Sequence, residues 1–175
     1  MAAQGTDSAQ TPNYERIAVM GIGNTLMLDE GVGPKVIEQL SERYEFPDSV
    51  SVIDSGTMGM SILHLFSEYD YILVVDAIDD PENLKPGDVV SFPPEEIAPN
   101  TVLHGLHDMR FIDVLQNAAM LGWNPDAHCV GIQVENIAPQ DLTEGLTPDV
   151  EAAIPVAIEA VVTLLGEIGI EANER

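Results

Sequence analysis

The chain has 175 residues, the usual size of one domain, and is long enough to bury a hydrophobic core. Thirty Asp and Glu residues against six Lys and Arg residues give a formal net charge of −24. This charge excludes nucleic-acid binding, because phosphate contacts need clustered cations, and it argues against docking on anionic membranes. Self-repulsion of so acidic a surface predicts a monomer.

Residues 1–14 are small and polar and are expected to form a flexible tail, followed by one domain over residues 15–175. The tail lacks the apolar stretch of a secretory signal. No run of about 18 apolar residues follows, so we expect no membrane insertion. The single cysteine, Cys129, excludes an internal disulfide. We therefore expect a cytoplasmic protein.

In the first half of the chain, apolar runs alternate with segments of helical spacing. Pro34 fits a helix only in the first turn, so the first helix is expected to begin shortly before it. The run that ends at Val75 is continuous and bounded by acids, which is typical of a buried strand. The expected elements are strands at residues 17–20, 50–53 and 71–75 and helices at residues 30–44 and 58–66.

The second half continues the same alternation. Thr147-Pro148 has the N-cap and first-turn proline pattern that opens a helix. Together the segments predict a single α/β domain, a mostly parallel twisted sheet of about five strands with helices on both faces. The expected elements are strands at residues 89–92 and 128–132, a helix at residues 108–121 and a last helix from residue 147.

A glycine turn, Gly21-Ile22-Gly23, follows the first strand. A dinucleotide-binding fingerprint needs a third glycine where Leu26 stands, and a short turn that leads directly into a helix. Asp54 ends the second strand, as a ribose-binding acid would. A nucleotide-binding protein is therefore one alternative, although a simple glycine turn accounts for both glycines.

Acids and histidines follow several predicted strands. Asp29 and Glu30 stand near a helix start, where the helix dipole stabilises carboxylates. Asp76 follows a buried strand, where an acid can simply cap a turn. His107 precedes a helix, and His104 lies three residues earlier and competes with it for any role.

Glu30, Asp76 and His107 are each expected at the carboxyl end of a different strand or in the loop just beyond it. In a parallel sheet these ends converge, and ligands bind there. Two carboxylates and one imidazole suit a borderline divalent cation such as zinc or nickel. Three protein ligands would leave positions open for a substrate or water. The grouping therefore predicts a metal site.

Other nucleophiles and histidines have weaker support. Ser55 and Ser61 lack the Gly-x-Ser-x-Gly context of a hydrolase serine. Cys129 lies inside a predicted strand, which is typical of a buried structural thiol. His64 and His128 are expected to be packing or surface residues.

Six stretches, in order along the chain, resemble motifs of the hydrogenase maturation endopeptidases, which process the large subunit of nickel–iron hydrogenases. The resemblance covers about residues 16–165. No single motif is decisive, but all of them in the right order are specific. The stretches are GIGNTLMLDEGVGPKVIEQL from Gly21, DSGTMGM from Asp54, VVDAID around Asp76, HDMRFIDVL from His107, CVGIQVE from Cys129 and GLTPDVEAAI from Gly145.

The resemblance implies roles for the three residues already grouped. The family's metal-contacting acids fall on Glu30 and Asp76, and its histidine falls on His107. His104 lacks the family's distance to the segment Asp113-Val114-Leu115. The segment Asp54-Ser55-Gly56-Thr57 stands where the family has Asp-Gly-Gly-Thr or Asp-Cys-Gly-Thr, and its serine leaves the role of this segment open.

The resemblance also implies an activity, removal of a C-terminal extension from the hydrogenase large-subunit precursor once nickel is in place. Nickel would be carried by cysteines of the substrate, and the isolated protein would bind metals such as zinc or cadmium weakly. The metal would polarise the scissile carbonyl or activate water. Glu30 or Asp76 is the candidate base of such an aspartyl-type endopeptidase. The alternative is a non-catalytic nickel-checking chaperone for the same precursor.

Overall fold

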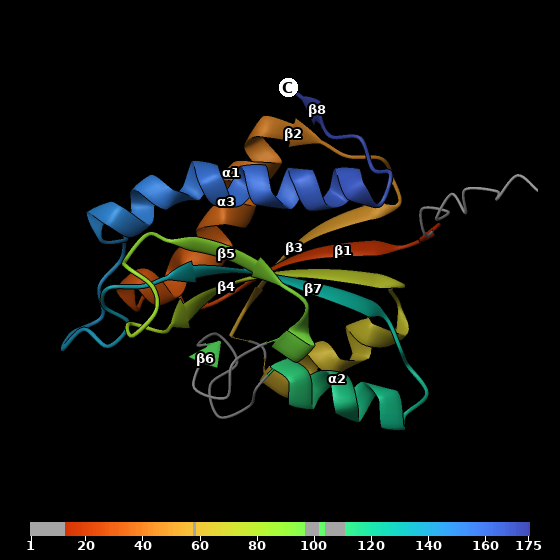
Figure 1. Ribbon diagram of the computed structural model, residues 1–175, viewed down its shortest axis with the longest axis horizontal. Coiled ribbons are helices and arrows are strands. Elements are labelled where there is room, and N and C mark those ends of the chain that lie inside the picture. The colour runs from red at the N-terminus through yellow and green to blue at the C-terminus, as the bar shows by residue number, and fades with distance from the viewer. Residues whose placement is uncertain (1–12, 58, 97–101, 104–110) are drawn as a thin grey trace, which may run out of the picture.

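A six-stranded sheet lies at the centre of the molecule in a computed structural model, which describes residues 13–57, 59–96, 102–103 and 111–175 (Figure 1). The strand order is β3-β1-β4-β7-β5, with β6 paired to β4. The strands are β1 (Ile17–Ile22), β3 (Val50–Gly56), β4 (Tyr71–Asp79), β5 (Val89–Phe92), β6 (Val102–Leu103) and β7 (Asp126–Gln133).

The long strands are parallel, and the two antiparallel additions lie next to β4 and β7. β1 pairs in parallel with β3 and β4, and β4 pairs in parallel with β7. β5 runs antiparallel to β7, and β6 runs antiparallel to β4. The predicted α/β class and its five strands are confirmed. The two-residue β6 was not predicted, because it is too short to show a periodicity.

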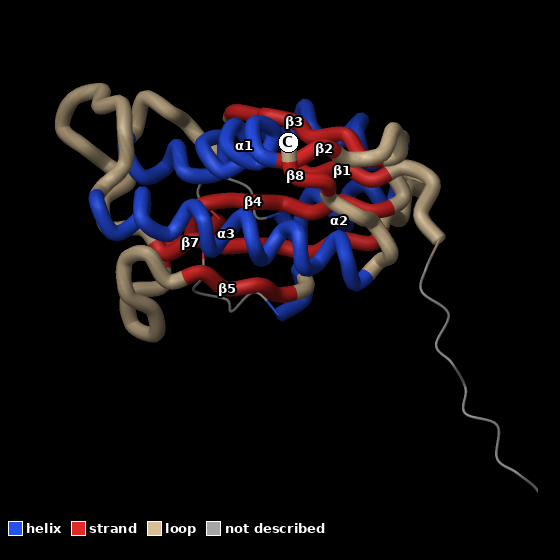
Figure 2. The backbone as a smooth tube through the Cα atoms, turned by 90° about the horizontal axis from the view of Figure 1, so that it is seen from above, coloured by secondary structure: helices blue, strands red, loops and turns tan. Residues whose placement is uncertain are grey.

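Helices cover both faces of the sheet. Figure 2 shows α1 (Val32–Arg43) and α3 (Pro148–Glu167) side by side across one face, where they contact each other. The other face carries α2 (Phe111–Met120) and the 3-10 helix η2 (Gly59–Ser67), which also touch. A small antiparallel pair joins β2 (Tyr44–Glu45) to β8 (Asn173–Glu174) near the C-terminus.

Alternating side chains of β4 divide the core into two apolar layers. Val75 belongs to the layer under α1 and α3, and Val74 and Ile78 belong to the layer under η2 and α2. β4 is buried on both faces and, apart from Asp76, apolar up to Ile78, as the continuous run that ends at Val75 predicts. Apolar burial of this kind is the main driving force for folding.

Several boundaries differ from the expectations. β4 does not end at Val75 but continues to Asp79, because β7 and β6 supply hydrogen-bonding neighbours on both of its edges. Residues 58–66 were expected to form an ordinary helix, and the described residues 59–67 form a 3-10 helix, which buries Ile62 and Phe66.

The first predicted helix is shorter than expected, and the third is described only in part. α1 begins at Val32 rather than at Glu30, after the 3-10 turn η1 (Leu28–Gly31). Residues 108–110 of the predicted third helix lie outside the described residues. No helix in the described part of the chain is long and apolar enough to cross a membrane.

Of the tail predicted at residues 1–14, residues 1–12 lie outside the described residues, so its boundary stays a prediction. The ring of Tyr14 lies 4.9 Å from that of Tyr71, and its hydroxyl donates to Asp126 at 2.6 Å. The domain therefore includes contacts made by Tyr14.

The start of α1 packs directly on the sheet because of two glycines. A Cβ atom on Gly33 would lie 2.2 Å from the carbonyl oxygen of Ile22 and 2.6 Å from that of Val75. A Cβ atom on Gly21 would lie 2.6 Å from the carbonyl oxygen of Gly33. Only glycine permits such close backbone approach. The fit places the beginning of α1 against the end of β1 and the middle of β4.

This contact generates a stability test. Gly33→Ala should lower the free energy of unfolding by roughly 2 kcal/mol or more, because the new methyl group meets backbone atoms that cannot move aside. Gly166→Ala in α3 is the matched control. A Cβ atom there meets nothing within 4 Å, so it should raise stability by about 0.5–1 kcal/mol through helix propensity. Urea denaturation measures both, and equal stabilities would contradict the packing described.

Candidate functional site

The loop between β1 and α1 folds back on itself at the carboxyl end of the sheet. Gly23 has φ of 145°, and a Cβ atom there would lie 1.9 Å from the carbonyl oxygen of Glu30. The N–H of Asn24 donates to the same oxygen at 3.2 Å. Gly21 and Gly23 are thus explained by close packing. A turn that led directly from strand to helix would be needed for pyrophosphate, and the intervening η1 replaces it.

Asp29 is a fully buried carboxylate that ties this loop to the loop between β7 and α3. Its side chain accepts hydrogen bonds from the N–H groups of Glu135 at 3.0 Å and Asn136 at 2.9 Å. It also accepts from the N–H of Thr147 at 2.7 Å and from its hydroxyl at 2.9 Å. Hydrogen bonds of this number compensate for the burial of a charge. Asp29 is therefore a structural residue.

Thr147 is the N-cap residue of α3 and Pro148 follows in the first turn, as predicted. Its hydroxyl makes no capping hydrogen bond and donates to Asp29 instead. The helix start is thus joined to the first loop.

Glu30 is 4% exposed and belongs to η1, which contacts β4. Glu30 precedes Gly33 by three residues, and Gly33 packs on Val75. The fold thus holds Glu30 at the end of the sheet where Asp76 follows Val75.

Asp76 is fully buried within β4, not directly after a strand as predicted. The pairing of β1 with β4 ends at Gly21 opposite Val75, so Asp76 stands just beyond the last residue of β4 that pairs with β1. Its Oδ1 atom accepts the N–H of Ala77 at 2.7 Å. By strand alternation Asp76 lies on the face that η2 and α2 cover.

His107 and His104 lie outside the described residues. The chain around them connects β6, whose Leu103 pairs with Ile78 two residues beyond Asp76, to the start of α2. Within the described part of the chain, no three His, Cys, Asp or Glu side chains form a metal-binding group. The triad of Glu30, Asp76 and His107 therefore stays a prediction.

The remaining reactive side chains are buried or partly buried. Burial raises the pKa of the Cys129 thiol and the nearby charge of Asp76 adds to this effect, so the thiol stays protonated. Burial also lowers the pKa of His128. Ser55 is 1% exposed, and its hydroxyl finds no hydrogen-bond partner among the described residues. The side chain of Ser61 lies outside the described residues.

Sequence reasoning missed Gln133, which is 1% exposed at the end of β7. Its side-chain oxygen accepts the N–H of Asp80 at 2.8 Å, and its side-chain nitrogen donates to the carbonyl of Val134 at 3.0 Å. The signal was available, because Gln133 is the polar residue that ends an apolar strand.

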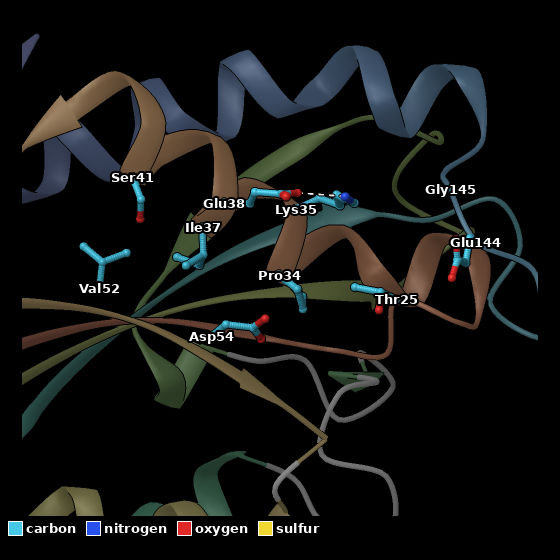
Figure 3. A pocket seen from close by; sticks show the side chains of 10 residues that line it. All are labelled: Thr25, Pro34, Lys35, Ile37, Glu38, Ser41, Val52, Asp54, Glu144 and Gly145. Atoms are coloured by element: carbon cyan, nitrogen blue, oxygen red, sulfur yellow. Dashed lines mark hydrogen bonds and ion pairs between the residues drawn. The ribbon is translucent and has the colours of Figure 1, made fainter. Parts of the chain in front are cut away.

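An open groove of about 780 Å³ lies between α1 and the edge strand β3 (Figure 3). Asp54 lines it and accepts the N–H of Gly56 at 3.0 Å, and the carbonyl of Gly56 accepts the N–H of Gly23 at 2.9 Å. The Asp54-Ser55-Gly56-Thr57 segment thus braces the first loop. The groove is lined by Thr25, Pro34, Lys35, Ile37, Glu38, Ser41, Val52, Asp54, Glu144 and Gly145.

Comparison with known proteins identifies the family. The family model described as hydrogenase maturation protease matches residues 34–164. The chain belongs to this family. It is therefore a peptidase of hydrogenase maturation, and membership of the family implies that it processes a hydrogenase precursor.

The match to curated and solved members of the hydrogenase maturation protease family covers nearly the whole chain. The hydrogenase 2 maturation protease of Escherichia coli is 38% identical, over 91% of this chain and 96% of the relative. The hydrogenase expression/formation protein HupD of Rhizobium leguminosarum is 34% identical, over 94% of this chain and 81% of the relative. The structure of the E. coli maturating endopeptidase HybD superposes with a TM-score of 0.76 at 35% identity, covering 91% of this chain and 98% of HybD.

The structural role of Asp29 predicts a large loss of stability in Asp29→Asn. An amide cannot accept all of the hydrogen bonds that the carboxylate accepts, so unfolding should become easier by roughly 2–3 kcal/mol. Thr147→Val removes only the hydroxyl donor and should cost about 1 kcal/mol. Chemical denaturation measures the free energy of unfolding of both variants. An Asp29→Asn variant as stable as the parent chain would refute the structural role of Asp29.

Proposed function

We propose that this protease removes the C-terminal extension of a hydrogenase large-subunit precursor that already carries nickel, and that Glu30, Asp76 and His107 contact that nickel. The nickel is part of the substrate, held by the precursor's own cysteines. The observation that carries the proposal is the burial of Glu30 and Asp76 at one end of the sheet, at 4% and 0% exposure.

Burial of ionisable carboxylates is costly, so their presence calls for a reason. For Asp29 the reason is structural, because backbone and hydroxyl donors surround its carboxylate. Asp76 accepts the N–H of its own neighbour Ala77, at the point where the pairing of β1 with β4 ends. The burial of both acids at the end of the sheet where ligands of such folds bind supports a role in chemistry.

The donor set fits a nickel ion. Carboxylate oxygens and an imidazole nitrogen suit borderline divalent cations. His107 belongs to the segment between β6 and α2, and β6 pairs with β4 just beyond Asp76. A histidine from this segment would therefore join the two acids at the carboxyl end of the sheet, where ligands of such folds bind.

The chemistry would be hydrolysis of one peptide bond. Nickel held by the precursor would polarise the scissile carbonyl. Glu30 or Asp76 would accept a proton from the attacking water and pass it to the nitrogen of the peptide bond as that bond breaks, which leaves a carboxylate and an amine. Recognition of nickel would delay cleavage until the metal has been inserted.

Substitution of the acids tests the proposal. Glu30→Gln and Asp76→Asn should reduce processing by roughly a hundredfold or more, the scale on which loss of an electrostatic stabiliser lowers kcat. Both should be as stable as the parent chain or slightly more stable, because they remove a buried charge. Mass spectrometry of a nickel-loaded precursor measures cleavage, and denaturation of the variants measures stability. Variants that unfold more easily yet still cleave would show both acids to be scaffolding.

The histidines provide a matched pair. His107→Ala should abolish processing, whereas His104→Ala should leave it nearly unchanged. The reverse result would assign the role to His104. A parent chain that binds the nickel-loaded precursor without shortening it would instead favour a nickel-checking chaperone.

The isolated protein should hold metal only weakly, because three ligands without cysteine make an incomplete site. Calorimetric titration with Zn²⁺ or Cd²⁺ should give a Kd of about 1 µM or weaker, corresponding to roughly 8 kcal/mol. His107→Ala should weaken binding further and His104→Ala should not. A stoichiometric metal that survives dialysis against a chelator would contradict a nickel ion supplied by the substrate.

A further inference from the structure

The edge strand β3 presents unpaired backbone groups. Among the described residues it pairs only with β1. The N–H of Ile17 donates to the carbonyl of Ser49 at 2.8 Å, so Ser49, Ser51 and Ile53 face β1 up to the register shift that follows Asp54. By this alternation Val52 turns its N–H and C=O groups, and Asp54 its N–H group, away from β1. Such an edge is a template for an additional strand.

A groove follows this edge. Figure 3 shows Val52 and Asp54 of β3 beneath Ile37 and Ser41 of α1, with the groove of about 780 Å³ between them. A second hollow of about 350 Å³ shares Ser41 and Val52 with it and continues to Val50. The two hollows together border most of β3, whose seven residues would span roughly 23 Å as an extended strand.

The other end of the groove reaches the loop of the candidate site. Thr25 lines the groove, and its Cα atom lies 2.8 Å from where a Cβ atom on Gly31 would stand. Gly31 directly follows Glu30. A strand added to β3 would therefore be led toward the buried carboxylates.

The groove is acidic. Glu38, Asp54 and Glu144 line it against a single cation, Lys35. The ammonium group of Lys35 lies 2.7 Å from Glu38, drawn as a dashed line in Figure 3. The hydrogen bond to Glu38, with further charges of Glu144 and Glu42, raises the pKa of Lys35. The lining thus has excess negative charge, which complements a basic segment.

We infer that this groove binds an extended, basic segment of the substrate polypeptide as an additional strand on β3. The inference rests on the proposed function, since it presumes a polypeptide substrate led to Glu30. Backbone hydrogen bonds to Val52 and Asp54 would provide affinity largely independent of sequence. The acidic lining would select for basic side chains.

Peptide binding tests the inference without nickel or cleavage. The probe is a fluorescein-labelled octapeptide of alternating Lys and Val, compared with a Glu-Val octapeptide and with the Lys-Val peptide carrying N-methylated amides. Fluorescence anisotropy should show binding of the Lys-Val peptide that weakens with salt. The acidic and N-methylated peptides should bind at least tenfold more weakly. Equal binding of all three, or no binding of the Lys-Val peptide, would overturn the inference.

Hydrogen exchange followed by NMR locates the added strand. Amide protons of Val52 and Asp54 should exchange more slowly when the Lys-Val peptide is bound. The amide of Val50 is the internal control, because it already donates to the carbonyl of Pro47 at 2.9 Å. Protection that leaves Val52 and Asp54 unchanged would place the peptide elsewhere and overturn the inference.

Charge variants test the acidic lining. Asp54→Asn keeps an oxygen for the N–H of Gly56 while removing the charge, and should weaken binding about two- to fivefold. Glu159→Gln on α3 makes the same charge change outside the groove lining and should have little effect. An equal loss of peptide affinity in both variants would mean that the net charge of the protein alone governs binding. That result would contradict a specific site.

The peptide result and the processing result are independent. Peptide binding together with a Glu30→Gln variant that still cleaves would refute the catalytic assignment and leave the added strand intact. Absence of peptide binding together with loss of processing in Glu30→Gln would refute the added strand and leave the proposed function intact.

Discussion

The buried carboxylate of Asp29 determines how the two long loops at the carboxyl end of the sheet fit together. It accepts hydrogen bonds from Glu135 and Asn136 on one loop and from Thr147 at the start of α3. Without these bonds a buried charge would be strongly unfavourable. Because Asp29 is fixed, Glu30 is fixed beside it. The position of the candidate site is thus a consequence of one structural acid.

Close backbone packing completes this arrangement. Gly33 lets α1 start directly against Ile22 and Val75, and Gly23 lets the first loop return to the carbonyl of Glu30. The sheet therefore brings Val75, and with it Asp76, to the same end of the molecule as the first loop.

Much of the fold could be predicted from the sequence, because its strands are apolar runs with clear ends and its helices have regular apolar spacing. The end of β4 could not, since Asp76 interrupts the apolar run while β7 and β6 continue the pairing. The different roles of Asp29 and Glu30 could not be predicted either, because two adjacent acids near the start of a helix show the same local sequence pattern. It emerged from partners more than 100 residues away in the chain. The assignment of His107 still rests on the family resemblance.

Under the proposed function, Glu30, Asp76 and His107 bind nickel that the precursor presents. Nickel K-edge X-ray absorption on the loaded precursor tests it directly, with the spectrum recorded before and just after mixing with the protease. We expect additional oxygen and nitrogen ligands around the nickel with the parent chain and none with a variant that combines Glu30→Gln, Asp76→Asn and His107→Ala. An unchanged nickel environment with the parent chain, under conditions in which the precursor is cleaved, would contradict it.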